Sequence, residues 1–303
     1  MRTLITGATG LLGKALLARV RDGVVLSRDP DQAVRRLGAV AVHAWAPEAG
    51  PPPGAALQDV DVIFNLAGAP IAEGRWTAER KRSIRDSRVL GTRNLVAGMA
   101  AMARRPRVLV SVSAVGYYGD RGDEQLDEDA SPGNDFLADV CVAWEGEALA
   151  AERLGVRVVC VRLGVVLAGQ GGALARMLTP FKLGIAGRIG DGRQWMSWVY
   201  LDDAIGILLH ASLDDRIRGG VNAVAPNPVT NAELTRVLGH VLHRPTVLAV
   251  PKLALRLALG EMSQVLTASQ RVFPRVVERT GYLFHQPQLD SAIRAALAAT
   301  ISQ

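Results

Sequence analysis

Three glycines near the start of the chain have the spacing of a phosphate-binding turn. A short β-prone run, Thr3–Thr6, leads into Gly7, Gly10 and Gly13, and a helical pattern follows at once. The first glycine allows a tight turn, the second lets the backbone approach phosphates, and the third lets the helix pack closely on the strand. The helix N-terminus adds free N–H groups and partial positive charge. Because a strand precedes the glycines and a helix follows them, the segment predicts a dinucleotide site rather than a plain turn. The predicted contacts are Gly7, Thr9, Gly10, Leu11, Leu12 and Gly13.

The end of the second predicted strand distinguishes between the two nicotinamide cofactors. In this kind of fold an acidic residue at that place usually binds the ribose 2′-hydroxyl of NAD. Here Ser27 and Arg28 follow the strand, and an arginine can pair with a 2′-phosphate while a serine adds a hydrogen bond. Asp29 could serve NAD instead, and both Ser27 and Arg28 could be ordinary loop residues. The charge favours NADP as the cofactor.

Small and hydroxyl-bearing residues follow the next two strands. Leu66, Ala67 and Gly68 would leave room for the cofactor at the carboxyl edge of a parallel sheet, although they could also form only a turn. Ser113 is expected at the same edge, with Tyr117 and Tyr118 shortly after it. These hydroxyls are candidates for proton transfer. Alternatively, the two rings pack beneath the loop with their hydroxyls bonded to the backbone.

Strand-like runs alternate with helical patterns through the first half of the chain. The strand candidates after the first are Val24–Leu26, Val40–Trp45, Val60–Leu66, Arg107–Val112 and Val156–Leu163, and the helix candidates are Gly13–Arg21, Asp31–Leu37, Thr77–Met102 and Phe136–Leu154. This alternation implies parallel pairing with right-handed crossovers. We therefore predict an α/β fold, a doubly wound parallel Rossmann sheet with a smaller C-terminal substrate lobe. The NADP-binding domain is assigned to residues 1–165, with 201–225 returning to it, and the lobe to 166–200 and 226–303.

Composition narrows the classes of partner. The net charge of +6 comes from 35 Lys and Arg against 29 Asp and Glu, but the arginines are scattered, which argues against nucleic acid. The chain shows neither a signal segment nor a membrane-length apolar run, so we expect a cytoplasmic protein that binds no membrane.

Cys141 and Cys160 lie in apolar patterns and are expected to be buried thiols. Apart from His240 and His243 the five histidines show no metal-ligand grouping, and that pair is expected to mark a helix end. No metal is predicted, and the oligomeric state stays open.

Taken together, the motifs resemble those of the extended short-chain dehydrogenase/reductases. Thr6–Gly13, Asn65–Gly68 and Ser113–Gly119 carry the general resemblance. The segments similar to the atypical, epimerase-like branch are Phe136–Glu145, Arg162–Leu167, Gly192–Val199, Asn222–Thr230 and Gly260–Met262. The resemblance extends from residue 1 to about Leu297 and implies an NADP-binding Rossmann domain with a small substrate lobe. We also assign Arg88 and Arg162 to the cofactor, although Arg162 could simply bridge to a carboxylate.

The usual catalytic pair of that family is missing. Short-chain dehydrogenases use a Tyr and a Lys four residues later, which share one helix face so that the ammonium can lower the phenol pKa and hold the ribose. No Tyr-x-x-x-Lys occurs in this chain, and Leu137 and Cys141 stand near the corresponding positions. A thiol in an apolar helix is normally inert, so Cys141 is a poor substitute. Ser113, Tyr117 and Tyr118 remain the catalytic candidates.

A polar and aromatic segment in the second half is the predicted substrate contact. Its candidates are Arg193, Gln194, Trp195 and Trp198. A guanidinium, an amide and two indoles suit a small molecule with an anionic or planar group, although the aromatics could equally anchor the lobe to the sheet. Three functions stay open. They are NADPH-dependent hydride transfer on a small carbonyl or alcohol, epimerase or dehydratase chemistry of the sugar-nucleotide type, and non-catalytic NADP binding as a redox sensor.

Overall fold

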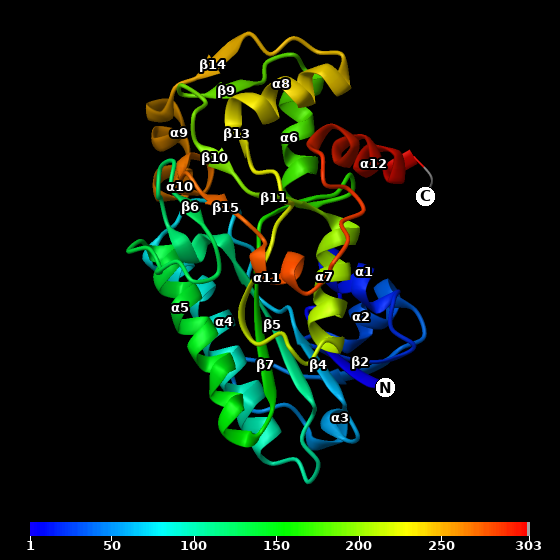
Figure 1. The fold of residues 1–303 in the computed structure, drawn as a ribbon. Coiled ribbons are helices and arrows are strands. Elements are labelled where there is room, and N and C mark those ends of the chain that lie inside the picture. Colours follow the sequence, from blue (N-terminus) through cyan, green and yellow to red (C-terminus); the bar gives the residue numbers. More distant parts are fainter. Residues whose placement is uncertain (302–303) are drawn as a thin grey trace.

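A seven-stranded parallel sheet organises the structure, a computed structural model that describes residues 1–301 (Figure 1). The strand order is β12-β7-β5-β4-β1-β2-β3. The bounds are β1 (Arg2–Thr6), β2 (Asp22–Ser27), β3 (Ala41–Ala44), β4 (Val62–Asn65), β5 (Val108–Ala114), β7 (Arg157–Leu163) and β12 (Gly219–Ala223). The chain turns from one side of the sheet to the other between β1 and β4, which is where a doubly wound sheet binds its ligand. The predicted fold class is confirmed.

Helices cover both faces of this sheet because its strands are apolar on both sides. Leu4 and Ile5 are neighbours in β1, yet each belongs to a different buried cluster, since successive side chains of a strand point to opposite faces. The face that includes Ile5 is covered by α1 (Leu11–Leu17), α2 (Pro30–Leu37) and α7 (Leu201–Leu213). The face that includes Leu4 is covered by α3 (Gly54–Leu57), α4 (Ala78–Ala100) and α5 (Phe136–Leu149).

Short strand pairs and helices form the smaller lobe at the top of Figure 1. The paired strands are β6 (Gln125–Leu126) with β15 (Arg271–Val272), β8 (Val165–Leu167) with β11 (Trp198–Tyr200), β9 (Gly187–Ile189) with β14 (Leu248–Val250), and β10 (Trp195–Met196) with β13 (Val229–Thr230). The remaining helices are α6 (Gly172–Lys182), α8 (Asn231–Leu242), α9 (Lys252–Leu259), α10 (Gln264–Thr267), α11 (Arg275–Arg279) and α12 (Leu289–Ile301), and 3-10 turns span Val115–Tyr118, Ala150–Leu154 and Gly260–Ser263. Helix α7 packs on the main sheet and β12 extends it beside β7, whereas the exact division into domains stays a prediction.

The predicted elements differ from the observed ones mainly at their ends. Helix α1 begins at Leu11 and ends at Leu17, whereas the pattern predicted residues 13–21. The predicted helix that ended at Leu154 instead ends at Leu149 and continues as a 3-10 turn to Gly155, which adopts a left-handed conformation at φ +78°. His243 is the left-handed cap after α8, which confirms the predicted helix end.

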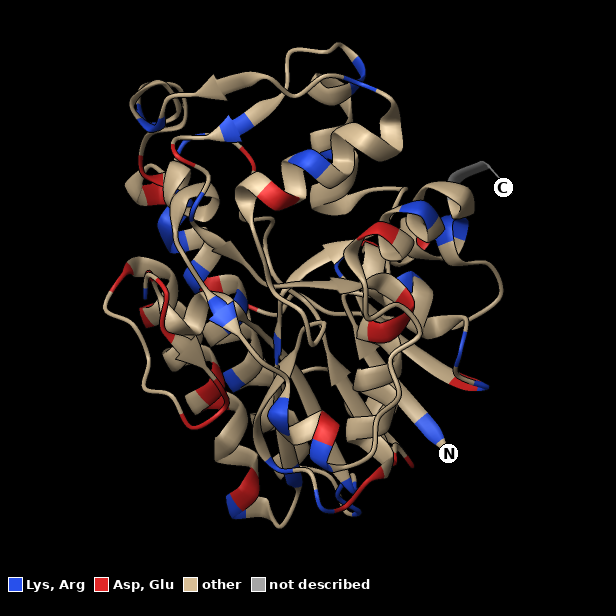
Figure 2. Ribbon diagram, turned by 45° about the horizontal axis from the view of Figure 1, so that its top comes forward, with Lys and Arg blue, Asp and Glu red and all other residues tan. Residues whose placement is uncertain are grey.

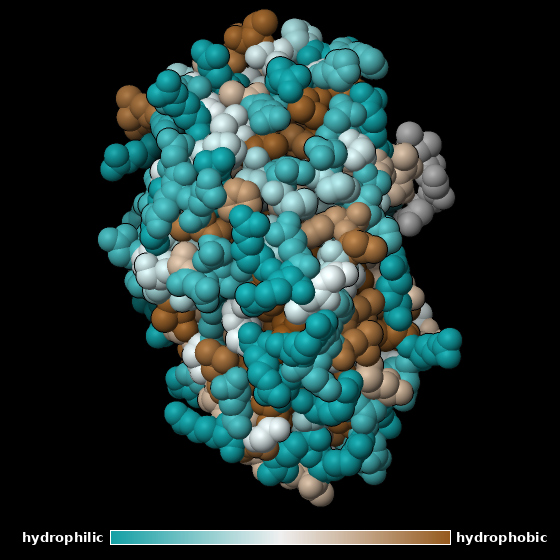
Figure 3. Space-filling view, in the orientation of Figure 1, coloured by the Kyte–Doolittle hydropathy of each residue, from teal (hydrophilic) through white to brown (hydrophobic). Residues whose placement is uncertain are grey.

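The surface is mixed in charge and polarity. Figure 2 shows Lys and Arg at both ends of the molecule and interspersed with Asp and Glu, and Figure 3 shows polar residues over most of one face with apolar ones among them. Within residues 1–301 no helix is both long and apolar enough to cross a bilayer. The same residues contain no cluster of three or more His, Cys, Asp or Glu side chains arranged to hold a metal ion.

Candidate functional site

The glycine turn lies between the carboxyl ends of β1 and β4. Gly7 has φ +70°, and a Cβ there would lie 2.9 Å from the Ala67 nitrogen. A Cβ on Gly13 would lie only 2.3 Å from the Gly7 carbonyl oxygen, so both positions exclude any side chain. Gly10 differs from them, because it is exposed and its Cβ would meet only the Gly7 oxygen, at 3.3 Å. The turn therefore packs tightly on β4 while it presents open backbone at the crevice of the sheet.

Buried side-chain hydrogen bonds hold this turn against β4. The Thr6 hydroxyl donates to Asn65 Oδ1 at 2.8 Å and accepts from the backbone nitrogens of Leu66 and Ala67 at 3.0 and 3.1 Å. Asn65 in turn donates through Nδ2 to the Thr92 hydroxyl on α4 at 2.8 Å. Sequence reasoning missed Thr6 and Thr92 as supporting residues. A polar residue at the end of an otherwise apolar strand, as at Thr6 and Asn65, was the available signal.

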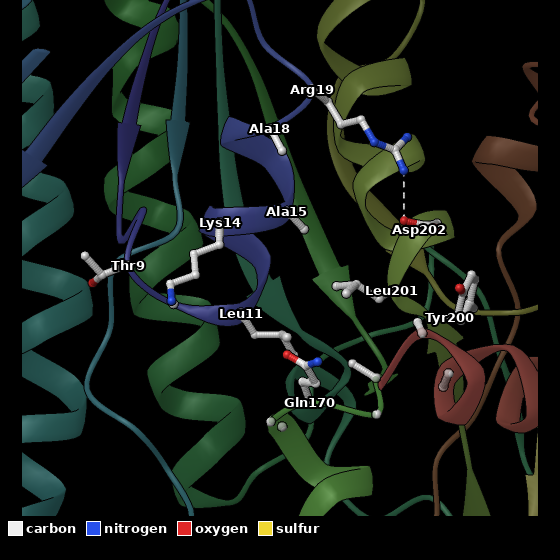
Figure 4. Close-up of a pocket in the computed structure, with 17 residues that line it drawn as sticks. Thr9, Leu11, Lys14, Ala15, Ala18, Arg19, Gln170, Tyr200, Leu201 and Asp202 are labelled. Carbon is white, nitrogen blue, oxygen red and sulfur yellow. Dashed lines mark hydrogen bonds and ion pairs between the residues drawn. The ribbon is translucent and has the colours of Figure 1, made fainter. Parts of the chain in front are cut away.

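A cavity of about 670 Å³ adjoins the glycine turn (Figure 4). Thr9, Leu11 and Lys14 lie on the side of the turn and α1, and Gln170, Tyr200 and Asp202 lie opposite them. Arg19 Nη2 donates to Asp202 Oδ1 at 2.9 Å and so links the segment just after α1 to α7. The cavity is thus lined by three of the predicted cofactor residues, Thr9, Gly10 and Leu11. Gly13 is buried behind them.

At the end of β2, Ser27, Arg28 and Asp29 differ in their hydrogen bonds and ion pairs. The Asp29 carboxylate accepts from the Gln32 nitrogen at 2.9 Å and caps α2, as expected of an N-cap aspartate. The Ser27 hydroxyl is bonded to the backbone of Asp29, donating to its oxygen at 3.0 Å and accepting from its nitrogen at 3.2 Å. Arg28 is exposed, and none of the ion pairs found within residues 1–301 includes it. The arginine is therefore available to an anion, while the aspartate is already engaged.

The positions of the missing catalytic pair lie where the sequence placed them, on α5. Leu137 packs in an apolar cluster that includes Trp76 and Met262. Cys141 lies one turn further along and is buried, and burial raises the pKa of its thiol to about 11, which the neighbouring Ser113 hydroxyl partly offsets. Ser113, at the end of β5, is 2% exposed and its Oγ has no other hydrogen-bond partner within the described chain. A leucine and a protonated thiol offer neither the proton donor nor the cation of the usual site.

The surroundings of Tyr118 and Arg162 contradict the roles predicted for them. The Tyr118 ring is fully buried, and its hydroxyl donates to Asn222 Oδ1 at 2.7 Å and accepts from Arg162 Nη1 at 3.0 Å. Burial raises the pKa of this phenol to about 12. Arg162 bonds both carboxylate oxygens of Glu145, at 3.0 and 2.9 Å, so its charge is already neutralised inside the protein. Neither the predicted proton donor Tyr118 nor the predicted cofactor ligand Arg162 is available to a small molecule, and the alternative of a bridge from Arg162 to a carboxylate is the observed one.

Tyr117 is placed differently from its neighbour. The guanidinium carbon of Arg162 lies 3.5 Å from the centroid of the Tyr117 ring. The Tyr118 ring packs edge-to-face with the Tyr117 ring. The Tyr117 ring is only partly buried, and none of the hydrogen bonds found among residues 1–301 includes its hydroxyl. Tyr117 is therefore held in place through its ring while its hydroxyl stays available.

Gly68 and Arg88 meet just beyond β4. A Cβ on Gly68 would lie 2.9 Å from the guanidinium carbon of Arg88. The arginine fills the space into which a side chain at Gly68 would project, whereas the backbone of Gly68 is exposed. Leu66 and Ala67 are half-buried beside the glycine turn.

The predicted substrate segment divides between surface and core. Arg193 is exposed, and Trp195 is half-buried, with its indole nitrogen bonded to Asp123 at 2.8 Å. Gln194 is buried, and its Oε1 has no hydrogen-bond partner within residues 1–301. Trp198 is 1% exposed in the core of the lobe, with its indole nitrogen bonded to the Asn227 carbonyl. The prediction that Trp198 contacts substrate is wrong, because the ring anchors the lobe.

The sheet is doubly wound, and the glycine turn lies where the strand order reverses, with exposed backbone at the crevice of the sheet. These features define a dinucleotide-binding protein of the extended short-chain dehydrogenase/reductase type. The chain belongs to the NAD dependent epimerase/dehydratase family, whose sequence pattern matches residues 3–222. A second pattern, a domain of unknown function, matches residues 250–296 of the lobe. The family resemblance inferred from the motifs is confirmed.

Individual relatives are similar over nearly the whole chain. Epimerase family protein Mb2239 of Mycobacterium bovis is 42% identical over 293 residues, covering 95% of each chain. The crystal structure of human epimerase family protein SDR39U1 (isoform 2) with NADPH has a TM-score of 0.87 at 32% identity, covering 98% of this chain and 99% of that one. A nucleoside-diphosphate sugar epimerase from Corynebacterium glutamicum has a TM-score of 0.80 at 35% identity, covering 99% of this chain but 58% of that one.

Proposed function

We propose that the protein binds NADP(H) and transfers hydride to or from a small carbonyl or alcohol substrate. The observation that carries the cofactor choice is the exposed, unpaired Arg28 at the end of β2, beside an aspartate that is committed to capping α2. A guanidinium favours a 2′-phosphate, and NADPH is the cofactor in the human relative's structure.

The residues at the turn fit a dinucleotide. Gly7 and Gly13 exclude side chains where the turn packs, and the open backbone at Gly10 allows phosphates to approach. Thr9, Leu11, Leu12, Ser27, Leu66, Ala67, Gly68 and Arg88 complete the set of proposed cofactor contacts. The nicotinamide, when bound, supplies or accepts the hydride.

Tyr117 is the residue that we propose as proton donor to a carbonyl oxygen. In the reducing direction hydride adds to the carbonyl carbon and the phenol proton goes to the oxygen, which yields the alcohol. Its hydroxyl lacks a protein partner, and the stacked Arg162 fixes the ring. Ser113 would orient the same oxygen, and Arg193, Gln194 and Trp195 would contact the rest of a small-molecule substrate.

Two experiments test this proposal in order. NADPH binding is measured first, by the change in nucleotide fluorescence on titration with the whole protein. Absorbance at 340 nm is then followed with a broad panel of aldehydes and ketones. Turnover that falls about 100-fold in Tyr117→Phe, but not in the control Tyr282→Phe, whose hydroxyl bonds Asp203 away from the cavity, supports the role of Tyr117. Unchanged turnover in Tyr117→Phe would contradict it.

The same measurements separate the two other functions. Family membership favours an epimerase or dehydratase that oxidises its substrate only transiently, in which case substrate is converted without net loss of NADPH. The leucine and thiol at the positions of the catalytic pair favour a non-catalytic NADP-binding sensor. Tight NADPH binding without conversion of any substrate in the panel would favour the sensor.

A further inference from the structure

Arg271, in β15, is a half-buried cation whose charge is not paired. Its guanidinium carbon lies 4.3 Å from the centroid of the Trp195 ring. Its Nε is buried without a hydrogen-bond partner, and none of the hydrogen bonds or ion pairs found among residues 1–301 includes the guanidinium. Among its nitrogens only Nε is closed off from solvent in this way, so the two terminal nitrogens stay open to a ligand.

The segment that contains β6 pairs with β15 and is rich in carboxylates, yet none of them neutralises this arginine. Asp123 accepts from the Trp195 indole nitrogen at 2.8 Å. Glu124 binds Arg121 through both carboxylate oxygens, at 2.8 and 2.6 Å. Glu128 accepts from two backbone nitrogens through Oε1. Three carboxylates of the adjoining segment therefore have other partners, and the charge on β15 is left for an anion from outside the protein.

Stacking on the indole orients the Arg271 guanidinium without using its donors. A guanidinium is attracted to the face of an indole, while its five N–H donors lie in its own plane and point outward. Arg162 shows that a stacked guanidinium can still bind a carboxylate, since it lies over the Tyr117 ring and bonds both oxygens of Glu145. Arg271 has the stack but no carboxylate. Its free edge suits the two oxygens of a carboxylate or phosphate group.

Strand β15 lies where the lobe meets the larger domain. The Gln270 backbone nitrogen donates to the Trp195 oxygen at 3.1 Å, which ties β15 to β10. Val272, the residue after Arg271, belongs to the buried cluster against which Tyr117 packs. Figure 1 shows β15 beside β6 and β10. The arginine is therefore close along the strand to the proposed proton donor, but its side chain meets the predicted substrate segment rather than the reacting group.

We propose that Arg271, stacked on Trp195, binds an anionic group, a carboxylate or a phosphate, at the end of the substrate away from the reacting carbonyl. This inference rests on the proposed substrate site and narrows its substrates to carbonyl compounds or alcohols that carry such a group. The exposed Arg193, two residues before Trp195, adds positive charge to the same segment. Because the contact is remote from the reacting atoms, Arg271 sets KM rather than kcat.

The test uses two matched pairs of probes with the whole protein and NADPH. One pair is succinic semialdehyde and its methyl ester, and the other is glycolaldehyde phosphate and glycolaldehyde. KM is measured from absorbance at 340 nm, and Kd by calorimetry for a probe that is not turned over. In at least one pair the charged member should bind about 10-fold or more tightly than the neutral one, the value of a hydrogen bond to a charged group. The pair that shows the preference distinguishes a carboxylate from a phosphate.

Arg271→Met should remove this preference by raising the KM of the charged probe about 10-fold or more, with kcat and the neutral probe unaffected. Arg271→Lys keeps a point charge without the planar fork and should retain part of the preference. Arg275→Met is the matched control. Arg275 also lies over an aromatic ring, 5.3 Å from the centroid of Phe273, but it is exposed and paired with Glu278, so its loss should spare both probes.

Two results would overturn the assignment. They are equal affinities of the wild type for the charged and neutral members of both pairs, and a preference for the charged member that persists in Arg271→Met. If the methionine variant does not fold, Arg271→Gln replaces it and should lose the preference to a similar extent. A wild type that prefers the charged probes without turning any of them over supports the role of Arg271 and contradicts only hydride transfer. A wild type that fails to bind NADPH contradicts the proposed cofactor, whatever its preference among the probes.

Discussion

Arg162 and Glu145 form a two-point ion pair inside the protein, with Nε–Oε1 and Nη2–Oε2 distances of 3.0 and 2.9 Å. The two residues are 5% and 6% exposed. Arg162 comes from β7 and Glu145 from α5, so the pair fastens a covering helix to the sheet. The same guanidinium stacks on Tyr117, and the pair therefore also supports the proposed proton donor.

Breaking this pair from one side should be strongly destabilising. Glu145→Gln leaves the Arg162 charge buried without its counter-charge, and the free energy of unfolding should fall by about 3–5 kcal/mol. The measurement is urea denaturation followed by far-UV circular dichroism. Asp290→Asn breaks the exposed pair with Arg294 and should change stability by less than about 1 kcal/mol. A loss for Glu145→Gln as small as that of the control would mean that the pair contributes little.

Gly13 and Gly146 should respond in opposite ways to alanine. A Cβ on Gly13 would lie 2.3 Å from the Gly7 oxygen, so Gly13→Ala must shift the turn, costing about 1–3 kcal/mol and abolishing NADPH binding. Gly146 lies inside α5 with nothing within 4 Å of its Cβ, so Gly146→Ala should stabilise the protein by about 0.5–1 kcal/mol. Melting temperatures and NADPH titrations of both variants check this. Retained binding in Gly13→Ala would show that the turn can relax.

The sheet and the glycine turn could be predicted because their signals are local. The turn at Gly7–Gly13 is specified by its spacing between one strand and one helix. Strand runs alternate with helices in a way that permits few topologies, and the missing catalytic pair is visible as an absent motif. The predicted helix ends were less accurate. The continuation of α5 as a 3-10 turn, for example, depends on tertiary packing rather than on the hydrophobic pattern of the sequence.

The sequence did not decide between the alternatives left open for Tyr118, Arg162 and Trp198. Each is polar or aromatic beside a predicted ligand edge, but their partners come from distant segments. The partner of Tyr118, Asn222, is 104 residues away and reaches it only because β12 is placed beside β7. Trp198 bonds Asn227 within the core of the lobe, which no periodicity revealed.

Both cysteines should be unreactive in the native protein. Burial raises the pKa of Cys141 to about 11 and also raises that of Cys160, so neither forms an appreciable thiolate near neutral pH. A chromogenic disulfide reagent at pH 8 should therefore label no thiol until urea unfolds the chain, and two thiols afterwards.

The same shifts give stability a pH dependence. In the unfolded chain a thiol ionises near pH ~8.5, so above that pH the unfolded state binds fewer protons than the native state and stability falls as pH rises toward about 11. Cys141→Ala should flatten part of this decline in urea denaturation at pH 7, 9 and 10.5. Rapid labelling of native protein at pH 8 would contradict the burial of these thiols.

Arg28 provides the sharpest test of cofactor choice, because it lies beside an aspartate that is already occupied. Asp29 caps α2 through Gln32, whereas Arg28 is exposed without an ion-pair partner in the described chain. Arg28→Asp should weaken NADPH binding by about 10-fold or more through loss of a charge-assisted contact to the 2′-phosphate. NADH lacks that phosphate, so its affinity should change little. Arg35→Asp, an exposed arginine near the other end of α2, changes the net charge equally and should spare both nucleotides. Equal losses for NADPH and NADH in Arg28→Asp would mean that the 2′-phosphate is bound elsewhere or that NADP is not the cofactor.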